Sequence, residues 1–517
     1  MSENFRPDGI FSDGLVLQRE RNAKLWGFCP EGETVTAFLD EQECTVECDC
    51  GRFLVTFPPQ KASTDRVIKL MCGGETIVIS DVCFGDVFLL SGQSNMELPV
   101  YRTLDLFEDE IKACDCENIR HFTIEQRFFF GEQAKELAPN KWTKAVYPDV
   151  LLHSAAGHFF AKVMQKELNV PIGLVLNAIG GSAIEAWMNE ETLAGFGDFT
   201  SGIKRFYDHK DFEDTIRNEE AAHNAWHEAL LRENEALTAS EMPEDTEAFT
   251  IPGMTFDTFL DDYSGSLWFY KEIELRDGSD EEGLLYLGEL VDSDRTYING
   301  QLVGETTYCY PPRKYTIPAG LLKKGKNLIA ARVVMLNGAG GFLPDHPYFL
   351  DTRNEKIDIT GEWRVKTESK APGYAPNVTF PPHLPTGLYN ASLYPLRNMQ
   401  FAGVLWYQGE TNAGDPDKYS EKFTAMMTQW RKLFNQELPV VCVELCDYIN
   451  PAERVNDLTG WQSIQRQQRE QPQYTENCAT APAHDLGENF EIHPRCKKEL
   501  GLRLAKAMLA LAYGREK

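Results

Sequence analysis

Short runs of alternating apolar and polar residues fill the first 80 positions of the chain. Thr34–Leu39 and Phe53–Phe57 are examples, and glycine, proline or aspartate separates each run from the next. Alternation with a period of two is typical of a strand buried on one face, and strands at intervals of about ten residues are typical of a β-sandwich. The pattern therefore predicts a small β-sandwich in this region.

Beyond residue 85 the apolar runs become continuous. Three of them have the length and content of strands buried on both faces of a parallel sheet: Val87–Leu90, Leu174–Leu176 and Gly403–Tyr407. Residues 153–168 and 500–511 carry apolar side chains at helical spacing. Residues 212–238, rich in Asp, Glu, Ala and Leu, predict a helix on the surface. The alternation of strands and helices predicts an α/β domain.

Alternating strand patterns return between the second and the third of these runs. Trp268–Leu275 alternates, and Tyr297–Val303 contains Asn299-Gly300, a pair that favours a two-residue hairpin turn. The α/β pattern resumes near Pro385. We therefore expect a β-sandwich of the jelly-roll type to be inserted into the α/β domain.

Composition narrows the class of partner. The formal charge of −28 argues against nucleic acid and anionic membrane surfaces, and the sequence has no apolar run of about 18 residues that would predict a membrane span. The N-terminus carries no apolar signal sequence. We therefore expect a cytoplasmic protein with reduced cysteines. The oligomeric state cannot be read from the sequence.

A metal site is not expected. Four of the thirteen cysteines lie close together: Cys44, Cys48, Cys50 and Cys72. Their spacing matches no usual zinc pattern and fits alternating strand positions instead. We predict no metal and no other cofactor.

Polar residues beside glycine follow each of the three continuous runs, and a histidine stands near the C-terminus. The segments are Ser-Gly-Gln-Ser-Asn-Met at 91–96, Asn-Ala-Ile-Gly-Gly-Ser at 177–182, Gln-Gly-Glu-Thr-Asn at 408–412 and Glu-Ile-His-Pro at 491–494. Open α/β sheets place reactive groups in loops just beyond the carboxyl ends of their strands. Ser94 is therefore a candidate nucleophile and His493 a candidate base.

Together with Glu-Ala-Trp-Met at 185–188, these motifs resemble those of the sialate O-acetylesterase family of carbohydrate esterases, part of the SGNH hydrolase group. The resemblance runs in order from about residue 10 to the end of the chain. It implies an α/β fold with a three-layer, SGNH/flavodoxin-like parallel sheet. It also implies ester hydrolysis through a serine nucleophile.

At 517 residues the chain is too long for one ordinary domain. We predict four segments: an N-terminal β-sandwich over 1–84, the first part of an SGNH hydrolase domain over 85–254, an inserted, sugar-binding-like β-sandwich over 255–350, and the second part of the hydrolase domain over 351–517.

Ester hydrolysis by Ser94 needs a base and a group that orients the base. His493 is expected to take the serine proton and deliver it to the departing sugar oxygen. Many members of the SGNH group place an aspartate three residues before this histidine, where this chain has Phe490. We favour Glu491 over Asp485 as the orienting acid, and a Ser–His dyad stays open.

The oxyanion hole is expected to combine the N–H groups of Ser94 and Gly181 with a side-chain amide. The wider group uses an asparagine for the amide, whereas this branch has Gln-Gly-Glu. We therefore name Gln408 first and Asn412 second. Glu410 is expected to anchor its loop through backbone N–H groups or to contact the substrate.

Sugar binding has its own candidates. Trp187, Trp406 and Tyr407 flank the loops, where they either stack on a pyranose ring or belong to the core. A sialic acid carboxylate would call for an arginine near the pocket. The arginines considered are Arg102, Arg127, Arg313 and Arg495.

The leading interpretation is a metal-free carbohydrate O-acetylesterase that deacetylates sialic acid or a related glycan through an acyl-Ser94 intermediate. One alternative is an acetyl xylan or xylo-oligosaccharide esterase of the same family. Another is a non-catalytic glycan-binding protein on an esterase scaffold. The presence of both Ser94 and His493 favours an enzyme whose partner is an acetylated sugar.

Overall fold

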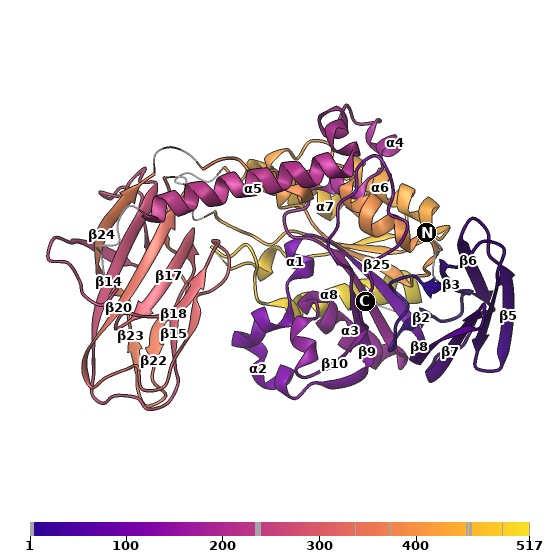
Figure 1. Cartoon of the computed structure of the whole chain (residues 1–517), viewed down its shortest axis with the longest axis horizontal. Coiled ribbons are helices and arrows are strands. Elements are labelled where there is room, and N and C mark those ends of the chain that lie inside the picture. Colours follow the sequence, from indigo (N-terminus) through magenta and orange to yellow (C-terminus); the bar gives the residue numbers. More distant parts are fainter. Residues whose placement is uncertain are drawn as a thin grey trace. The chain divides into compact units, whose positions relative to one another are not determined.

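The structure is a computed structural model that describes residues 5–232, 239–336, 338–371, 373, 375–450, 453, 457–488 and 490–515. The chain forms two compact units (Figure 1). The first contains residues 1–213, 380–447 and 457–517, and the second contains residues 214–379 and 448–456.

A largely parallel sheet forms the centre of the first unit, with strand order β10-β9-β11-β8-β25-β26-β27. The strands are β8 (Glu75–Gly92), β9 (Asp115–Thr123), β10 (Thr143–Val146), β11 (Ile172–Ala178), β25 (Gly403–Tyr407), β26 (Val440–Val443) and β27 (Cys478–Ala481). Only the edge strand β10 runs antiparallel to its neighbour among these described strands. The three continuous apolar runs are confirmed as buried strands of this sheet.

The register of β8 determines where the predicted loops emerge. Gly92, the last residue of β8, lies opposite Ala178 of β11 on one side and Tyr407 of β25 on the other. The three strands therefore end at one level, and the chain leaves each of them at the carboxyl edge of the sheet. This edge is where open α/β sheets bind their ligands.

Helices lie on both sides of β25. Gly403 lies against Met508 of α8, whereas Trp406, which points to the opposite face, packs on Trp430 of α6. The helices of this unit are α1 (Ser94–Glu97), α2 (Leu104–Lys112), α3 (Ala155–Leu168), α4 (Glu190–Leu193), α6 (Tyr419–Phe434), α7 (Thr459–Glu470) and α8 (Lys497–Tyr513). Mixed helices and sheets are thus confirmed.

The helix predicted over 153–168 begins at Ala155 instead. The Ser154 hydroxyl accepts a hydrogen bond from the Gly157 N–H at 3.1 Å and caps the first turn. Leu500, Leu504 and Met508 of α8 are buried, so the predicted apolar stripe faces the core.

The first 80 residues form two β-sheets. One contains β1 (Arg6–Pro7), β3 (Ala23–Phe28) and β6 (Arg52–Phe57), and the other contains β4 (Thr34–Leu39), β5 (Gln42–Glu47), β7 (Ser63–Cys72) and the first part of β8, with β2 (Val16–Gln18) parallel to β8. The single long strand β8 continues from the second of these sheets into the parallel sheet.

The expectation that all cysteines are reduced is wrong at one pair, because Cys29 and Cys48 form a disulfide. Cys29 directly follows β3 and Cys48 directly follows β5, so the disulfide connects the two sheets of this region. Disulfides are typical of oxidising compartments. The predicted cytoplasmic location stays a prediction, and this disulfide weighs against it.

The second unit is predominantly β. It contains most of the long helix α5 (His209–Arg232) and the strands β12 (Glu247–Ile251), β13 (Gly253–Met254), β14 (Gly265–Leu275), β15 (Gly283–Leu287), β16 (Leu290–Val291), β17 (Ser293–Ile298), β18 (Gln301–Thr306), β19 (Lys314–Ile317), β20 (Gly325–Met335), β21 (Gly341–Phe342), β22 (Tyr348–Asp351), β23 (Lys356–Asp358) and β24 (Gly361–Lys370). Of the helix predicted over 212–238, residues 233–238 lie outside the described residues.

The strands of this unit form sheets of six, four and three strands around one apolar core. Asn299 and Gly300 connect β17 to β18 with φ angles of 50° and 84°. Positive φ at both central residues is what a type I′ turn requires, so the predicted hairpin is confirmed.

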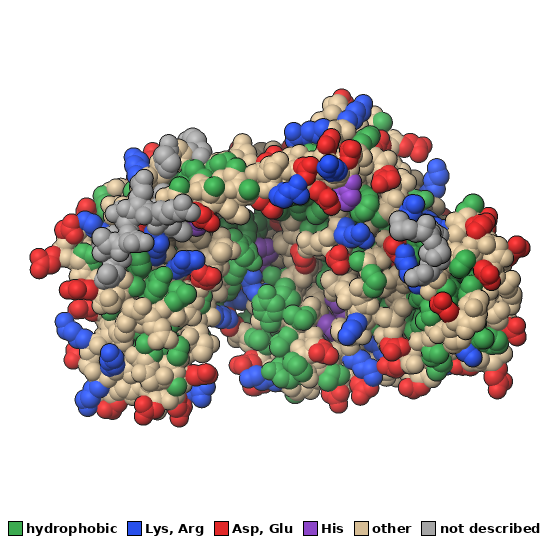
Figure 2. Space-filling model, viewed as in Figure 1, with side chains coloured by type: hydrophobic (Ala, Val, Ile, Leu, Met, Phe, Trp, Pro, Cys, Tyr) green, Lys and Arg blue, Asp and Glu red, His purple; other side chains and the backbone are tan. Residues whose placement is uncertain are grey.

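Acidic side chains are spread over the face of the molecule in Figure 2 rather than gathered in one patch. No helix in the described part of the chain is both long enough and apolar enough to cross a membrane.

Three histidines form a buried cluster in the first unit. The rings of His121 and His153 stack with their centroids 4.6 Å apart, and His121 Nε2 accepts the Ser154 N–H at 3.2 Å. Neither ring nitrogen of His158 has a hydrogen-bond partner among the described residues. Burial lowers the pKa of His153 to about 4 and the pKa of His158 to about 3. The cluster is therefore held neutral in the folded state.

We predict that acid destabilises the first unit through this cluster. Each folded-state pKa lies below the ordinary value of 6.5, so below pH 6.5 the unfolded chain binds more protons than the folded chain. The contribution to the free energy of unfolding is intact above pH 6.5. It falls by up to about 1.4 kcal/mol per pH unit for each histidine between pH 6.5 and its folded pKa. Urea denaturation across this range measures the slope.

His158→Met removes one of the three titrating groups and should make the slope shallower. His209→Met is the matched control, because the His209 side chain is 49% exposed on α5, and it should keep the wild-type slope. Equal slopes in H158M and in the wild-type protein would contradict the assignment.

Candidate active site

Ser94 is the first residue of α1, directly beyond the carboxyl end of β8. It is partly exposed, while Gln93 and Asn95 on either side are buried. The Ser94 N–H is at a helix N-terminus and has no acceptor among the described residues. The serine thus combines a reachable hydroxyl with an available backbone donor.

Asn95 connects the Ser94 loop to two of the three other loops that carry candidate residues. Its side-chain Nδ2 donates to Glu410 Oε1 at 2.7 Å and to the carbonyl oxygen of Ile492 at 2.9 Å. Because Asn95 follows Ser94 and Ile492 precedes His493, these hydrogen bonds bring the candidate nucleophile and base to the same region of the sheet edge.

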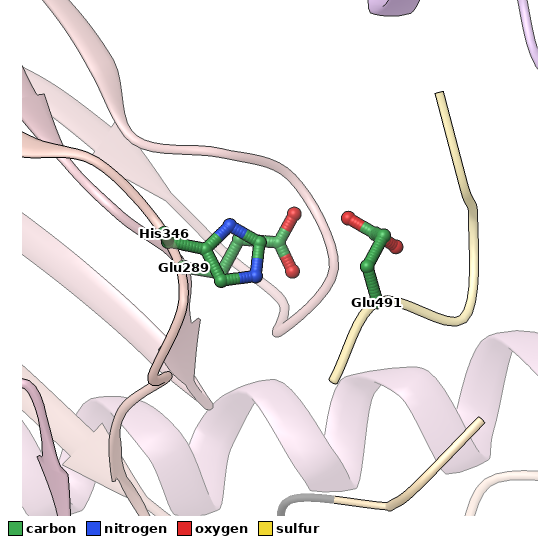
Figure 3. Close-up of side chains that lie close together, drawn as sticks. All are labelled: Glu289, His346 and Glu491. Carbon is green, nitrogen blue, oxygen red and sulfur yellow. The ribbon is translucent and has the colours of Figure 1, made fainter. Parts of the chain in front are cut away.

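The base and its favoured acid stand two residues apart on a buried loop. Glu491, shown in Figure 3, accepts the backbone N–H of His493 through Oε1 at 2.6 Å. The same oxygen lies 3.5 Å from His493 Nδ1, close enough for electrostatic contact and long for a hydrogen bond. Burial lowers the pKa of His493, and Glu491 opposes that effect. The imidazole is therefore neutral near pH 7 and can accept a proton.

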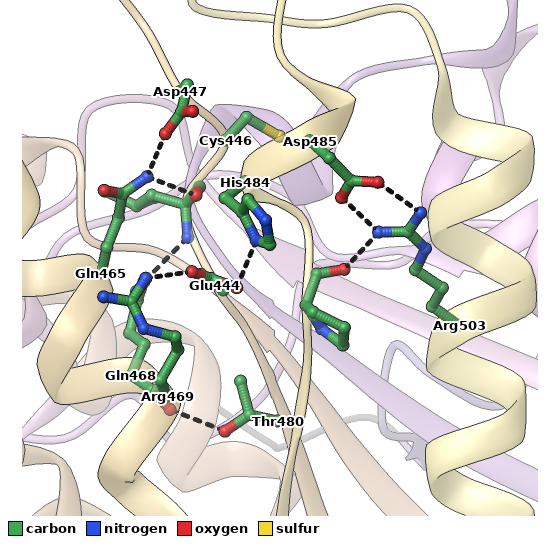
Figure 4. Close-up of polar contacts among 12 residues, drawn as sticks. Glu444, Cys446, Asp447, Gln465, Gln468, Arg469, Thr480, His484, Asp485 and Arg503 are labelled. Carbon is green, nitrogen blue, oxygen red and sulfur yellow. Dashed lines mark hydrogen bonds and ion pairs between the residues drawn. The ribbon is translucent and has the colours of Figure 1, made fainter. Parts of the chain in front are cut away.

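Asp485, the alternative acid, makes different contacts. Both of its carboxylate oxygens accept hydrogen bonds from Arg503 of α8, at 2.6 and 2.8 Å (Figure 4). This guanidinium lowers the pKa of Asp485 to about 2. The Asp485 side chain is 50% exposed, whereas Glu491 is buried beside the histidine. The geometry thus favours Glu491 as the orienting acid.

Gly180 and Gly181 lie beside the serine loop. The Gly180 N–H donates to Glu97 Oε2 at 2.7 Å, and a Cβ on Gly180 would stand 3.5 Å from the Ser94 Cβ. Gly181 has a φ of 70°, which favours glycine, and its N–H has no acceptor among the described residues. Gly181 rather than Gly180 therefore offers an available donor.

The two predicted amide donors are engaged elsewhere. Gln408 Nε2 donates to Ser182 O at 3.1 Å and to Asn412 Oδ1 at 2.6 Å. Asn412 Nδ2 donates to the Glu185 carboxylate at 3.1 Å. Both side chains are buried and connect neighbouring loops. The expectation that one of them presents a free donor to the oxyanion is not met here.

Gln93 is the amide that sequence reasoning missed, although it stands inside the first motif. Its Oε1 accepts the N–H groups of Gly409 and Thr411, each at 3.4 Å. Its Nε2 donates to no acceptor in the described part of the chain.

Of the two roles left open for Trp187, Trp406 and Tyr407, the structure supports the core and not sugar stacking. Trp187 and Trp406 are fully buried, as is Tyr407, and the two indole rings pack on one another and on Trp430. They belong to the core because β25 is covered by α6. Glu410 is also buried, and its Oε1 accepts a hydrogen bond from Asn95.

Phe380 is the exposed aromatic residue that the pattern did not reveal. It is 48% exposed, and a Cβ on Gly181 would stand 2.7 Å from its ring. The ring also packs edge-to-face on His383 with the centroids 4.9 Å apart. No periodic pattern in the sequence marks this position.

The four candidate arginines have different surroundings. Arg313 is fully buried and paired with Asp294 in the second unit, and Arg495 binds Glu488. The guanidinium of Arg127 lies over the ring of Phe129. Arg102 is partly exposed, and its charge helps to lower the pKa of His493.

The residues described above form a candidate site at the carboxyl edge of an α/β sheet, and comparison with known proteins gives the family of the chain. The family described as "Carbohydrate esterase, sialic acid-specific acetylesterase" matches residues 84–231 and 384–510, more than half of the chain. The chain belongs to this family.

The curated relatives match a smaller part of the chain than the family does. The sialate O-acetylesterases of Rattus norvegicus and Homo sapiens are each 27% identical to the chain, over 215 and 211 residues. The match covers 37% of this chain and about two fifths of each relative, 39% and 40% respectively. A carbohydrate acetylesterase from Xanthomonas citri has a similar fold, with a TM-score of 0.60, 21% identity and coverage of 99% of this chain and 76% of that chain.

We predict that Glu491→Gln lowers kcat about 100-fold by removing the anion that stabilises the imidazolium. Because Glu491 raises the pKa of His493, the acid limb of the kcat/KM profile should also move to lower pH. Steady-state rates on an acetyl ester across pH measure both effects.

Asp485→Asn is the matched control and should leave kcat and the profile unchanged. If D485N lost activity and E491Q kept it, the roles of the two acids would be reversed.

Proposed function

We propose that the protein is a carbohydrate O-acetylesterase that uses Ser94 as nucleophile and His493 as general base. The observation that carries the proposal is a pair of hydrogen bonds from the side chain of Asn95, the residue after Ser94. One goes to the carbonyl oxygen of Ile492, the residue before His493, and the other goes to the Glu410 carboxylate. Family membership supports the acetyl ester as the bond that is hydrolysed.

In the first step Ser94 Oγ attacks the acetyl carbonyl carbon while His493 takes the hydroxyl proton. A bond forms between Oγ and carbon, and the carbonyl electrons move onto the oxyanion. When the intermediate collapses, the bond to the sugar oxygen breaks and His493 gives that oxygen its proton. Water then attacks the carbonyl carbon of acetyl-Ser94 while His493 takes a proton from the water. The bond between that carbon and Ser94 Oγ breaks, His493 returns the proton to Oγ, and acetate leaves.

The N–H groups of Ser94 and Gly181 suit the oxyanion, since neither has an acceptor among the described residues. We propose the Gln93 amide as the third donor in place of Gln408 and Asn412. Removing one such donor typically costs about 3–4 kcal/mol of transition-state stabilisation. Glu491 orients His493 by accepting its backbone N–H, and the same carboxylate oxygen faces Nδ1 of the imidazole.

The sugar is proposed to lie against Phe380, whose exposed ring covers Gly181. For a sialic acid substrate we propose Arg102 as the partner of the carboxylate, because its charge already acts on His493. An acetylated xylo-oligosaccharide has no carboxylate and would not need this arginine.

We also propose the finer fold assignment. The parallel strands β11, β8, β25, β26 and β27 lie side by side in the order 2-1-3-4-5 that flavodoxin-like sheets have, and helices lie on both sides of β25. This order supports an SGNH/flavodoxin-like, three-layer hydrolase domain with β9 and β10 added at one edge. The sheets of the second unit support a jelly-roll type of module. The four segments 1–84, 85–254, 255–350 and 351–517 stay a prediction.

We predict that Ser94→Ala lowers acetate release from an acetylated sugar about 10³-fold or more, since the proposed acyl intermediate forms on the Ser94 hydroxyl. Ser91→Ala is the matched control from the same motif. Ser91 is fully buried and its Oγ has no hydrogen-bond partner among the described residues, so this variant should keep wild-type turnover. Unchanged turnover in S94A would refute the nucleophile.

A panel of O-acetylated sialic acids and xylo-oligosaccharides separates the substrate classes by rate. Arg102→Gln should raise KM for the sialic acids alone if the arginine binds their carboxylate. An equal effect on both classes would remove Arg102 from sugar recognition. Glycan binding without any acetate release would favour the non-catalytic alternative.

A further inference from the structure

Lys497 is a lysine in a place that three physical rules disfavour. Its side chain is buried, with the whole residue 1% exposed, although an ammonium is among the groups most costly to remove from water. It is the first residue of α8, where the helix dipole disfavours a cation. Its position near His493 also opposes the protonation of that base. Residues that break such rules together are expected at functional sites.

The neighbouring lysine shows what an ordinary position on this helix looks like. Lys498 is 52% exposed and its Nζ pairs with Glu110 at 2.6 Å. The burial of Lys497 is therefore specific to one residue and is not a property of the first turn of α8.

The Lys497 ammonium determines how the Asn95 amide is turned. Lys497 Nζ donates to Asn95 Oδ1 at 2.5 Å. An ammonium has only donors, whereas the Glu410 carboxylate and the Ile492 carbonyl oxygen that face Nδ2 are acceptors. Only one orientation of the amide satisfies all three partners, and in that orientation both Nδ2 hydrogens are used.

The surroundings of Lys497 are mostly acidic. The groups that act on it are Cys446, Glu410, Glu488 and Glu491, with the ring of Tyr407 at 5.2 Å from Nζ. Burial lowers the pKa of Lys497 to about 8, and these acids oppose that effect. Burial also raises the pKa of Glu410, whose Oε2 has no hydrogen-bond partner among the described residues. The lysine therefore supplies the positive charge that offsets buried acids.

We propose that Lys497 is a positioning residue that fixes Asn95 and thereby holds Ser94 and His493 in register for acyl transfer. The proposal rests on the proposed function, since it takes that serine and that histidine as the reacting pair. Lys497 acts through Asn95 and touches no reacting atom. Above the pKa of Lys497 the cation is lost, the buried Glu410 loses its compensating charge, and the register loosens.

Lys497→Met tests the proposal. It should lower kcat on an acetylated sugar about 10–100-fold, the range expected from misplacing reacting groups by about 1 Å, and it should leave KM within about threefold. The wild-type kcat profile should fall above about pH 8, and K497M should lack this alkaline limb. Lys498→Met, with the same substitution one residue away, should behave like the wild-type protein.

Amide hydrogen exchange followed by mass spectrometry measures the register without turnover. In K497M, exchange should rise at residues 94–97 and 490–494 and stay unchanged in the strands of the parallel sheet. If the wild-type protein releases no acetate, the proposed function fails, and this exchange result still decides whether Lys497 holds the two loops.

Two results would overturn the positioning role. One is K497M with wild-type kcat and pH profile, and the other is K497M with wild-type exchange at both loops. If K497M does not fold, the wild-type profile decides, because a kcat that stays flat through pH 8–9 contradicts the proposal. Lys497→Arg, which keeps the cation at all these pH values, should then retain activity without the alkaline limb.

Discussion

The hydrogen bonds of one side chain, Asn95, connect the loops that carry the proposed nucleophile and the proposed base. The strands fix only where the loops begin: β8, β11 and β25 end level with one another at Gly92. The C-terminal loop that carries His493 belongs to none of these strands, so the sheet alone does not place it. The bond from Asn95 Nδ2 to the Ile492 carbonyl oxygen supplies that missing connection.

Several ionisable or polar groups are buried in this protein, and burying each of them costs free energy. Glu410, Lys497 and the histidine cluster would each favour water over the protein interior, and their pKa values shift accordingly. A buried network of this kind is costly when partly broken and rigid when complete. The site is held in one geometry because Asn95 reaches Glu410, Ile492 and Lys497 together only when their segments meet.

Sequence patterns predicted the elements well where the physical signal was local. The apolar runs at 87–90, 174–176 and 403–407 became buried strands because a parallel sheet covers both faces. Asn299-Gly300 became a hairpin turn because both residues accept positive φ. The Ser94 motif was found because a reactive loop follows a buried strand.

Sequence patterns did not predict the contacts between segments that lie far apart in the chain. From the sequence Trp187 and Trp406 could stack on a sugar or belong to the core, and the packing of Trp430 of α6 on both rings places them in the core. The amides of Gln408 and Asn412 carry the right chemistry, and their engagement with Ser182 and Glu185 depends on tertiary packing. Cys29 and Cys48 follow strands of two different sheets, and the spacing of the cysteines did not show that these positions meet.

The most direct test of the account is covalent labelling by a fluorophosphonate, which reacts much faster with a serine activated by a base than with an ordinary hydroxyl. Intact mass and peptide mapping of the labelled protein give the number and position of adducts. The account predicts one adduct per chain, on Ser94, and much slower labelling in His493→Gln. An adduct on another residue, or equal labelling rates in the two proteins, would contradict it.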